Sequence, residues 1–302
     1  MLVLTIPWIL LLLLVIAVVF LLKKKWKIAL LLLLLILAIN WWSDCFCFGF
    51  KNSFSGDLTI LSFNVNGPKE NDEYIITSVI SLINKEEPDV FFLTESYNQL
   101  EDTLYVRFHQ LYPYNTKFMS HSMIYSRYPI HKSHFFDRPN GGSAYITQCY
   151  VLSVNGKDLD MYGCHLSSNN YSTELEYLTP NEIDTFEKLM SYFKNINNSS
   201  YFRELEADTI VRSLAGNKNV IVMGDMNDIA GSTTMRILSK AGLKDAWSEG
   251  GFGYGATIHY PLPYRIDHIL YNEGLVLKGV KVIDTSDISD HNALVAVFDF
   301  SN

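Results

Sequence analysis

Residues 219–228 read NVIVMGDMND, an apolar run that ends at a glycine and continues directly into acidic and amide side chains. A short apolar run bounded by turn residues predicts a buried strand. Gly224 allows a tight turn at its end. Asp225 and Asn227 lie two residues apart, so in extended backbone both point to the same side. The stretch therefore predicts a buried strand that presents two polar side chains together at its end.

Five further stretches carry polar residues where an apolar strand should end. They are SFNVN at 62–66, LTE at 93–95, GCHL at 163–166, RIDH at 265–268 and SDH at 289–291. The turn after a buried strand needs few polar side chains of its own, so six polar strand ends in one chain indicate a single convergent site at a sheet edge.

The order and wording of these motifs resemble the endonuclease/exonuclease/phosphatase superfamily, which includes DNase I-like nucleases, sphingomyelinase-like phosphodiesterases and inositol-phosphate phosphatases. The resemblance covers residues 57–300. It implies an α+β fold, a four-layer αββα sandwich (DNase I-like), and a divalent-metal hydrolase of phosphate esters. Thr94 stands where the family commonly has glutamine and Met226 where it commonly has phenylalanine, and neither is an expected ligand.

Hydrophobic periodicity predicts the same layering independently. Strands are expected near 58–65, 89–94, 121–127, 143–154, 157–165, 219–224, 266–271, 276–283 and 293–300, with helices over 72–85, 181–195 and 202–215. These strands alternate with too few helices for a Rossmann fold, whereas two packed sheets flanked by helices fit. The polar stretch 167–180 is expected to be a loop beside His165, either a substrate-selecting loop or a solvated connector.

Asn64 and Glu95 are the expected metal ligands. Mg²⁺ prefers hard oxygen ligands and keeps several waters, so one or two carboxylates with an amide suffice, and Mn²⁺ is a possible substitute. Asp290 of the SDH motif is expected beside the metal or beside the neighbouring histidine. Taken singly, Asn64 is typical of a turn and Glu95 of a surface, and only the ordered set of motifs favours a site.

Five residues are expected to carry the chemistry: His165, Asp225, Asn227, Asp267 and His291. The resemblance implies that Asp225 orients or deprotonates the attacking water and that Asn227 holds a phosphate oxygen. The alternative is an Asx-turn that caps the next helix. A histidine suits proton transfer near pH 7, and Asp267 is expected to fix the tautomer of His291.

Asn66 and Arg265 are the expected substrate-binding residues. Asn66 varies among family members. Arg265 either contacts phosphate or forms a salt bridge within the fold. The expected reaction is in-line attack of water on phosphorus, with no covalent enzyme intermediate.

Two apolar runs precede this region. Residues 2–22 form a run of 21 uncharged residues and residues 28–42 a run of 15, separated by four lysines within 23–27. A bilayer core needs about 20 apolar residues, so the first run is long enough and the second is short. We expect a membrane anchor with two transmembrane helices, a helical hairpin, over 1–42, a linker over 43–56 and a catalytic domain over 57–302.

A cleaved signal peptide is the alternative, but no Lys or Arg precedes Leu10 and no convincing small-residue cleavage site follows. The lysines favour a cytoplasmic loop at Lys23–Lys27, which would place the catalytic domain on the extracytoplasmic side of the membrane. The expected partners are the membrane, through residues 2–42, and a phosphate-ester substrate, with no protein partner.

Charge separates the candidate functions. Residues 51–302 contain 20 basic against 31 acidic residues, a formal charge of −11. Such a domain has no broad attraction for a polyanion, which favours a lipid headgroup or small phosphoester over DNA or RNA. An extracytoplasmic nuclease and a non-catalytic binding module on the same fold are the alternatives.

The cysteines predict no disulfide. Asn155-Gly156 is a strong two-residue hairpin signal, and a Val154–Lys157 pair would place Thr147 opposite Cys164. Cys149 would then lie diagonal to Cys164, too far for an easy bond. Buried free thiols are expected.

Overall fold

The computed structural model describes residues 5–67, 73–117, 121–137, 145–169, 185–214, 216–259 and 263–301. Most of the expected loop 167–180 lies outside these residues. The described helices are α1 (Ile6–Leu22), α2 (Trp26–Ser43), α3 (Glu73–Glu86), α4 (Asn98–Phe108), α6 (Thr185–Ser213), α7 (Thr233–Lys240) and α8 (Ala246–Gly250).

The described strands form two six-stranded sheets and one short ribbon. The first sheet has the order β10 (Lys244–Asp245), β12 (Asp267–Tyr271), β9 (Val220–Asp225), β8 (Lys157–His165), β7 (Tyr145–Val154), β6 (Ile130–Asp137). The second has the order β13 (Leu275–Ile283), β14 (Ala293–Phe300), β2 (Leu58–Asn64), β3 (Val90–Thr94), β5 (Met123–Ser126), β4 (Tyr114–Lys117). The ribbon pairs β1 (Cys47–Phe48) with β11 (Phe252–Gly253).

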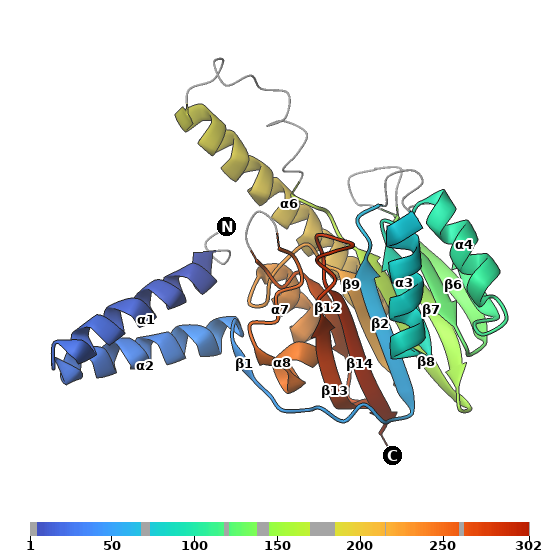
Figure 1. Ribbon diagram of the computed structural model, residues 1–302, viewed down its shortest axis with the longest axis horizontal. Helices are drawn as coiled ribbons and strands as arrows, with labels where there is room; N and C mark the ends of the chain where they lie inside the picture. Colours follow the sequence, from blue (N-terminus) through green and yellow to red (C-terminus); the bar gives the residue numbers. More distant parts are fainter. Residues whose placement is uncertain are drawn as a thin grey trace.

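Three apolar cores hold the sheets and helices in layers. The central core lies between the sheets and includes Ile60, Met223 and Ile269. Residues of α3 and α4 pack on the outer face of the β2–β3 sheet. Residues of α6 and α7 pack on the outer face of the β8–β9 sheet. The predicted α+β fold with two sheets is thereby confirmed, with its helices on the outer faces (Figure 1).

The β7–β8 hairpin has the predicted register. Val154 pairs with Lys157 and Thr147 with Cys164, and all four cysteines are free. The Thr147 hydroxyl donates a hydrogen bond to Cys164 Sγ at 3.4 Å. The interpretation of Cys149 and Cys164 as unpaired thiols is confirmed.

Helices α1 and α2 lie against each other and project together from one side of the sheets (Figure 1). Among the described residues, α2 alone is long and apolar enough to cross a membrane by length and composition, and α1 is a shorter apolar helix of 17 residues. Helix α2 is longer than the second apolar run because it begins at Trp26, ahead of that run, and continues to Ser43.

Residues 44–53, within the expected linker, pack on the region that contains the two sheets. Cys45 and Cys47 are buried. Gly49 N donates to Gly251 O at 2.7 Å and Lys51 N to Gly250 O at 3.0 Å. This segment is therefore part of the folded domain in the structure, because the two cysteine side chains and the β1–β11 ribbon fix its path.

Candidate functional site

Strand alternation places the site residues of the β8–β9 sheet in the gap between the two sheets. Met223 of β9 faces the central core, so Asp225, two residues later, faces the same gap. Met161 of β8 also faces that core, and the same alternation brings His165 to the gap. His165 and Asp225 are register partners at the ends of these two parallel strands.

The neighbouring strands supply two further residues at the same edge. Asp267 begins β12 and pairs directly with Asp225. Ile60 of β2 faces the central core, so Asn64 at the end of β2 reaches the gap from the opposite sheet. Parallel strands end on the same side of a sheet, and both sheets therefore deliver polar residues to one place.

Asn64 connects the two sheets. Its Nδ2 donates to Glu95 Oε1 at 2.9 Å and to Asp225 Oδ2 at 3.1 Å. Its Oδ1 accepts from the backbone N of Asn66 at 2.9 Å. The amide is buried and fully engaged, so it fixes two carboxylates that would otherwise repel each other.

Glu95 follows β3 in a strained backbone conformation. Its φ is +54°, a left-handed value that glutamate rarely adopts. The turn is held by backbone hydrogen bonds from Val65 N to Thr94 O and from Gly67 N to Glu95 O. Strain of this kind persists where the surrounding structure enforces it, commonly at functional sites.

Glu95, His165 and Asp225 each offer a ligand atom, and these atoms lie within 4.8 Å of one another. His165 Nε2 is 3.4 Å from Glu95 Oε1 and 3.9 Å from Asp225 Oδ2. The side chains of Glu95 and His165 are 33% and 23% exposed, whereas Asp225 is 2% exposed. The cluster is thus open to solvent on the Glu95–His165 side and closed at Asp225.

Asp267 and His291 form the enclosed end of the site. His291 Nδ1 lies 2.8 Å from Asp267 Oδ2, and His291 Nε2 lies 4.0 Å from Asp225 Oδ2. Burial lowers the pKa of His291, but the carboxylates of Asp267, Asp225 and Asp290 outweigh that effect and raise the pKa to about 10. The raised pKa favours the protonated imidazole, and its Nε2 faces Asp225.

Asp290 lies beside His291 but outside both groups of potential ligand atoms among the described residues. Its Oδ1 is buried and has no hydrogen-bond partner in the described part of the chain. A buried carboxylate oxygen without a donor is costly. A carboxylate oxygen of this kind is the type of hard ligand that a divalent cation takes.

Asn227 and Asn66 lie at the border of the site. Asn227 N donates to Asp225 Oδ1 at 2.8 Å and its Nδ2 to Leu166 O at 3.0 Å. The first bond forms the Asx-type turn considered from the sequence, and it also orients Asp225. Asn66 is exposed, with a φ of +46°.

Arg265 is not brought together with the other site residues. Its guanidinium is buried and forms an ion pair with Asp245. Its Nη2 donates to the backbone O of Asp44 at 3.0 Å. A contact with substrate phosphate is contradicted by this burial, and the salt bridge within the fold is what the structure contains. His268 also contacts Asp245, at 2.8 Å.

Two supporting residues were missed from the sequence. Ser289 Oγ donates to Asn64 O at 2.8 Å and accepts from His291 N at 3.0 Å. Thr257 Oγ1 accepts from the backbone N of Asp267 at 2.9 Å. Ser289 belongs to the SDH motif and could have been found there, whereas Thr257 has no local signal because its partner lies ten residues away.

Two facing sheets whose strand ends gather carboxylates, an amide and two histidines define a hydrolase-type site with groups placed for a metal ion. The profile of the Endonuclease/Exonuclease/phosphatase family matches residues 61–291. The chain belongs to this family. This membership supports phosphoester hydrolysis as the general kind of reaction. No curated protein matches the chain significantly in sequence.

Solved structures show the same fold at low sequence identity. TDP2 from D. rerio, humanized by 14 mutations, has a TM-score of 0.61 and 18% identity over 80% of this chain and 98% of that chain. The 3′ phosphatase NExo from Neisseria, bound to a product DNA hairpin, has a TM-score of 0.59 and 16% identity over 80% of this chain and 100% of that chain. A family protein from Leptotrichia buccalis has a TM-score of 0.57, with 18% identity over 80% and 100% of the two chains.

Proposed function

We propose that this protein is a membrane-anchored, divalent-metal-dependent phosphodiesterase or phosphatase that acts on a lipid headgroup or another small phosphate ester outside the cytoplasm. The observation that carries the proposal is the Asn64 amide, which joins Glu95 and Asp225 from opposite sheets beside His165. That arrangement concentrates negative charge at one solvent-open edge, which a divalent cation would neutralise.

Glu95 and Asn64, with Asp290, would hold Mg²⁺ or Mn²⁺. When bound, the ion would neutralise charge on the phosphoryl oxygens. In the rotamer observed, Asn64 turns Nδ2 toward the carboxylates, so ligation through Oδ1 requires rotation of the amide. Such a rotation gives up both hydrogen bonds from Nδ2 and the one that Oδ1 accepts from Asn66 N, so the bound cation would have to replace these interactions.

The proton chemistry is assigned to Asp225 and His291. Asp225 has one oxygen fixed by Asn227 N, and its other oxygen faces Asn64 and both histidines. We assign Asp225 to accept a proton from the attacking water. The protonated imidazole of His291, held by Asp267, donates to a phosphoryl oxygen in the transition state. His165, at the open side, and Asn227 bind the remaining phosphoryl oxygens.

The membrane part of the proposal rests on α1 and α2. Four lysines lie at or beside the turn between these helices, which favours a cytoplasmic turn at Lys23–Lys27 and an extracytoplasmic catalytic domain. With α2 at 18 residues and α1 at 17, a transmembrane hairpin would fit a thin or locally adjusted bilayer. We propose the division into anchor 1–42 and catalytic domain 57–302, with residues 44–53 of the linker packed on the catalytic domain.

The test is hydrolysis by the full chain in phosphatidylcholine vesicles, with Mg²⁺ or with EDTA. Substrates are phospholipids, small phosphate esters, plasmid DNA and RNA. Asp225→Asn should lower kcat by about 10²–10⁴-fold, since it removes a proton acceptor with little change in shape. Asp158→Asn, at an exposed hairpin carboxylate, is the matched control and should retain full activity.

A nuclease is the second candidate, favoured by the similar structures described as bound to DNA products. The acidic domain disfavours it. Metal-dependent cleavage of DNA or RNA that weakens steeply with salt would establish the nuclease and overturn the lipid or small-ester proposal. Absence of turnover on every substrate, with normal folding, would favour a non-catalytic binding module.

A further inference from the structure

The chain that leaves α2 carries an unusual side-chain pattern on the β1–β11 ribbon. Along residues 45–50, CFCFGF, the cysteines are buried and the phenylalanines at 48 and 50 are exposed. Phe252 of β11 is exposed opposite Phe48. We call the side chains of Phe48, Phe50 and Phe252 the aromatic patch. Its three members are 65%, 76% and 62% exposed.

The three rings form one cluster. Phe50 stacks on Phe252 with centroids 5.2 Å apart, and Phe48 meets Phe252 edge to face at 6.3 Å. The outer face of a two-stranded ribbon is ordinarily polar because it meets water. Single exposed apolar residues are common, but a cluster of three exposed aromatic rings marks an interaction surface.

The position of the patch identifies its occupant. Phe48 lies five residues after the end of α2 at Ser43, and Trp41 and Trp42 at that end are themselves exposed. Aromatic side chains gather where a membrane helix leaves the bilayer, since their rings suit the boundary between headgroups and acyl chains. The patch therefore continues the interfacial belt of α2 onto the catalytic domain.

Several contacts fix the domain against the end of α2. Arg236 Nη2 donates to Trp42 O at 3.0 Å, and its guanidinium lies 4.1 Å from the Trp42 ring centroid. Arg265 Nη2 donates to Asp44 O. A Cβ on Gly231 would lie 2.7 Å from Ser43 O, so the two backbones are in close contact. The patch is thereby held at a set position relative to α2.

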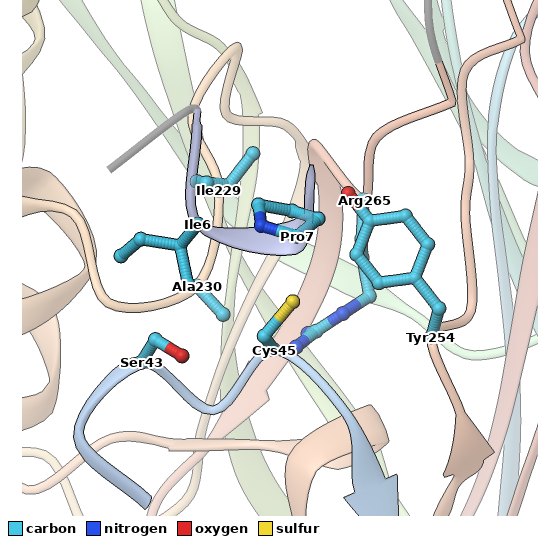
Figure 2. Close-up of a pocket in the computed structure, with 8 residues that line it drawn as sticks. All are labelled: Ile6, Pro7, Ser43, Cys45, Ile229, Ala230, Tyr254 and Arg265. Carbon is cyan, nitrogen blue, oxygen red and sulfur yellow. The ribbon is translucent and has the colours of Figure 1, made fainter. Parts of the chain in front are cut away.

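Helix α1 adds a second attachment. Trp8 Nε1 donates to Tyr264 Oη at 3.2 Å. Figure 2 shows Ile6 and Pro7 of α1 facing Cys45, Ile229 and Ala230 across a small cavity. The cavity measures about 10 Å³, space for one water at most, so it is a packing gap and no substrate pocket.

We propose that the aromatic patch inserts into the membrane–water interface and seats the catalytic domain on the lipid bilayer in a fixed orientation. The proposal rests on the membrane-anchored function proposed above. It adds a lipid-contact surface on the catalytic domain itself. The phenyl rings leave water for the interfacial region, while the hydrogen bonds from Arg236 and Arg265 keep the ribbon aligned with α2.

The test places an environment-sensitive NBD label at one introduced cysteine in the full chain, reconstituted in phosphatidylcholine vesicles with or without spin-labelled phosphatidylcholine as quencher. Phe50→Cys probes the patch and Leu31→Cys, exposed in α2, probes the anchor. Val106→Cys is the matched control, exposed in α4 on the side of the sheets away from α1 and α2 (Figure 1). The native chain, labelled identically, gives the background.

Positions 31 and 50 should lose about half or more of their fluorescence to the spin-labelled lipid, and position 106 should be unaffected. Quenching at 31 but not at 50 would overturn the proposal. Blue-shifted emission at 50 that the lipid quencher leaves unchanged would show a second copy or another protein on the patch, and would also overturn it. Absence of quenching at both 31 and 50 would show that neither α2 nor the patch contacts lipid, and would overturn the proposal.

Hydrolysis measured in the same vesicles separates this proposal from the proposed function. Metal-dependent turnover without quenching at position 50 would support the proposed hydrolase and contradict the proposed lipid contact. Quenching at position 50 without turnover on any substrate would support the lipid contact and contradict the proposed hydrolase activity.

Discussion

Asp267 and His291 are held as one unit at the closed end of the candidate site. His291 Nδ1 lies 2.8 Å from Asp267 Oδ2, and both side chains are nearly inaccessible to solvent. Residues that act together through one hydrogen bond lose most of their effect when either is changed. The double variant Asp267→Asn/His291→Gln should therefore have nearly the same kcat as the single variant His291→Gln, about 10²–10⁴-fold below the native enzyme.

The measurement is a double-mutant cycle on kcat in the Mg²⁺-dependent assay, with thermal unfolding of each variant as the folding control. His259→Gln provides the matched histidine control, since His259 Nε2 contacts Asn292 Oδ1 at 3.0 Å and lies outside both clusters. Losses that multiply across the two sites would show that Asp267 and His291 act independently and that the pair is no functional unit.

The native cysteines should resist alkylation in the folded protein. Burial raises the pKa of the Cys45 and Cys164 thiols from 9.0 to about 12 and that of Cys149 to about 11. The thiolate is the reactive form, so a higher pKa leaves less of it at pH 8. Iodoacetamide should modify these three residues at least about 10-fold more slowly in the native protein than in urea.

Mass spectrometry of tryptic peptides gives the extent of modification, and an introduced exposed thiol at Val106→Cys reports the intrinsic reagent rate in the same sample. Rapid native modification of Cys164 would contradict its placement between Thr147 and the α6 helix. The same result would mean that native cysteines also react with the NBD label, so the introduced cysteine in the aromatic patch could not be labelled selectively.

At the scale of elements, the junction of β8 and β9 depends on Gly224. Its φ is +129°, and a Cβ there would lie 2.0 Å from Cys164 O. Gly156, in the β7–β8 turn, has a φ of +79° but no atom within 4 Å of the same position. Gly156→Ala should cost about 1 kcal/mol from backbone conformation alone, whereas Gly224→Ala should cost about 3 kcal/mol or more because it adds a backbone clash.

Thermal and denaturant unfolding of the two variants, compared with the native chain, measures this difference. Gly224→Ala should also lower metal-dependent turnover, because β9 delivers Asp225 one residue later. Equal stability losses for the two glycines would show that the strand can shift away from Cys164 O, and would contradict the close packing of these two strands.

Elements with strong periodicity were predictable from sequence, and those set by distant partners were not. The strands that end at Asn64, His165 and Asp225 follow from apolar runs and polar ends. Helix α6 runs unbroken from Thr185 to Ser213, although the sequence predicts two helices separated near 196–201. Ile196 and Arg203 are both buried, so tertiary packing outweighs the weak helix propensity of the Asn- and Ser-rich middle.

The site shows the same division. The convergence of the motif residues was predictable, because side chains at alternate positions of a strand face the same side and this alternation can be read from the local sequence. The partners of Arg265 did not, because Asp245 is 20 residues away and Asp44 is 221 residues away. From the sequence alone, Arg265 could be a phosphate ligand, and only the fold shows that Asp245 neutralises its charge.

At the scale of the whole molecule, the segment after α2 joins the two N-terminal helices to the two sheets. Asp44 O accepts from Arg265, which lies two residues before Asp267. Cys47 belongs to the same apolar core as the β9 and β12 strands. Helix α2 and the candidate site therefore share one packed region, which reaches the strand that begins at Asp267.

This arrangement predicts different stabilities for two fragments that both lack α1 and α2. A fragment beginning at Asp44 keeps the ribbon and the hydrogen bond to Arg265, whereas a fragment beginning at Lys51 loses Cys47 from the core and exposes the Arg265 guanidinium. The shorter fragment should be less stable by about 2–4 kcal/mol, from lost apolar burial and hydrogen bonds. Its Tm should fall by about 5–15 °C, measured by differential scanning fluorimetry in detergent. Equal Tm values would show that residues 44–50 add no stability and form the free linker that the composition predicts. The domain would then be tethered to α2 without a fixed orientation.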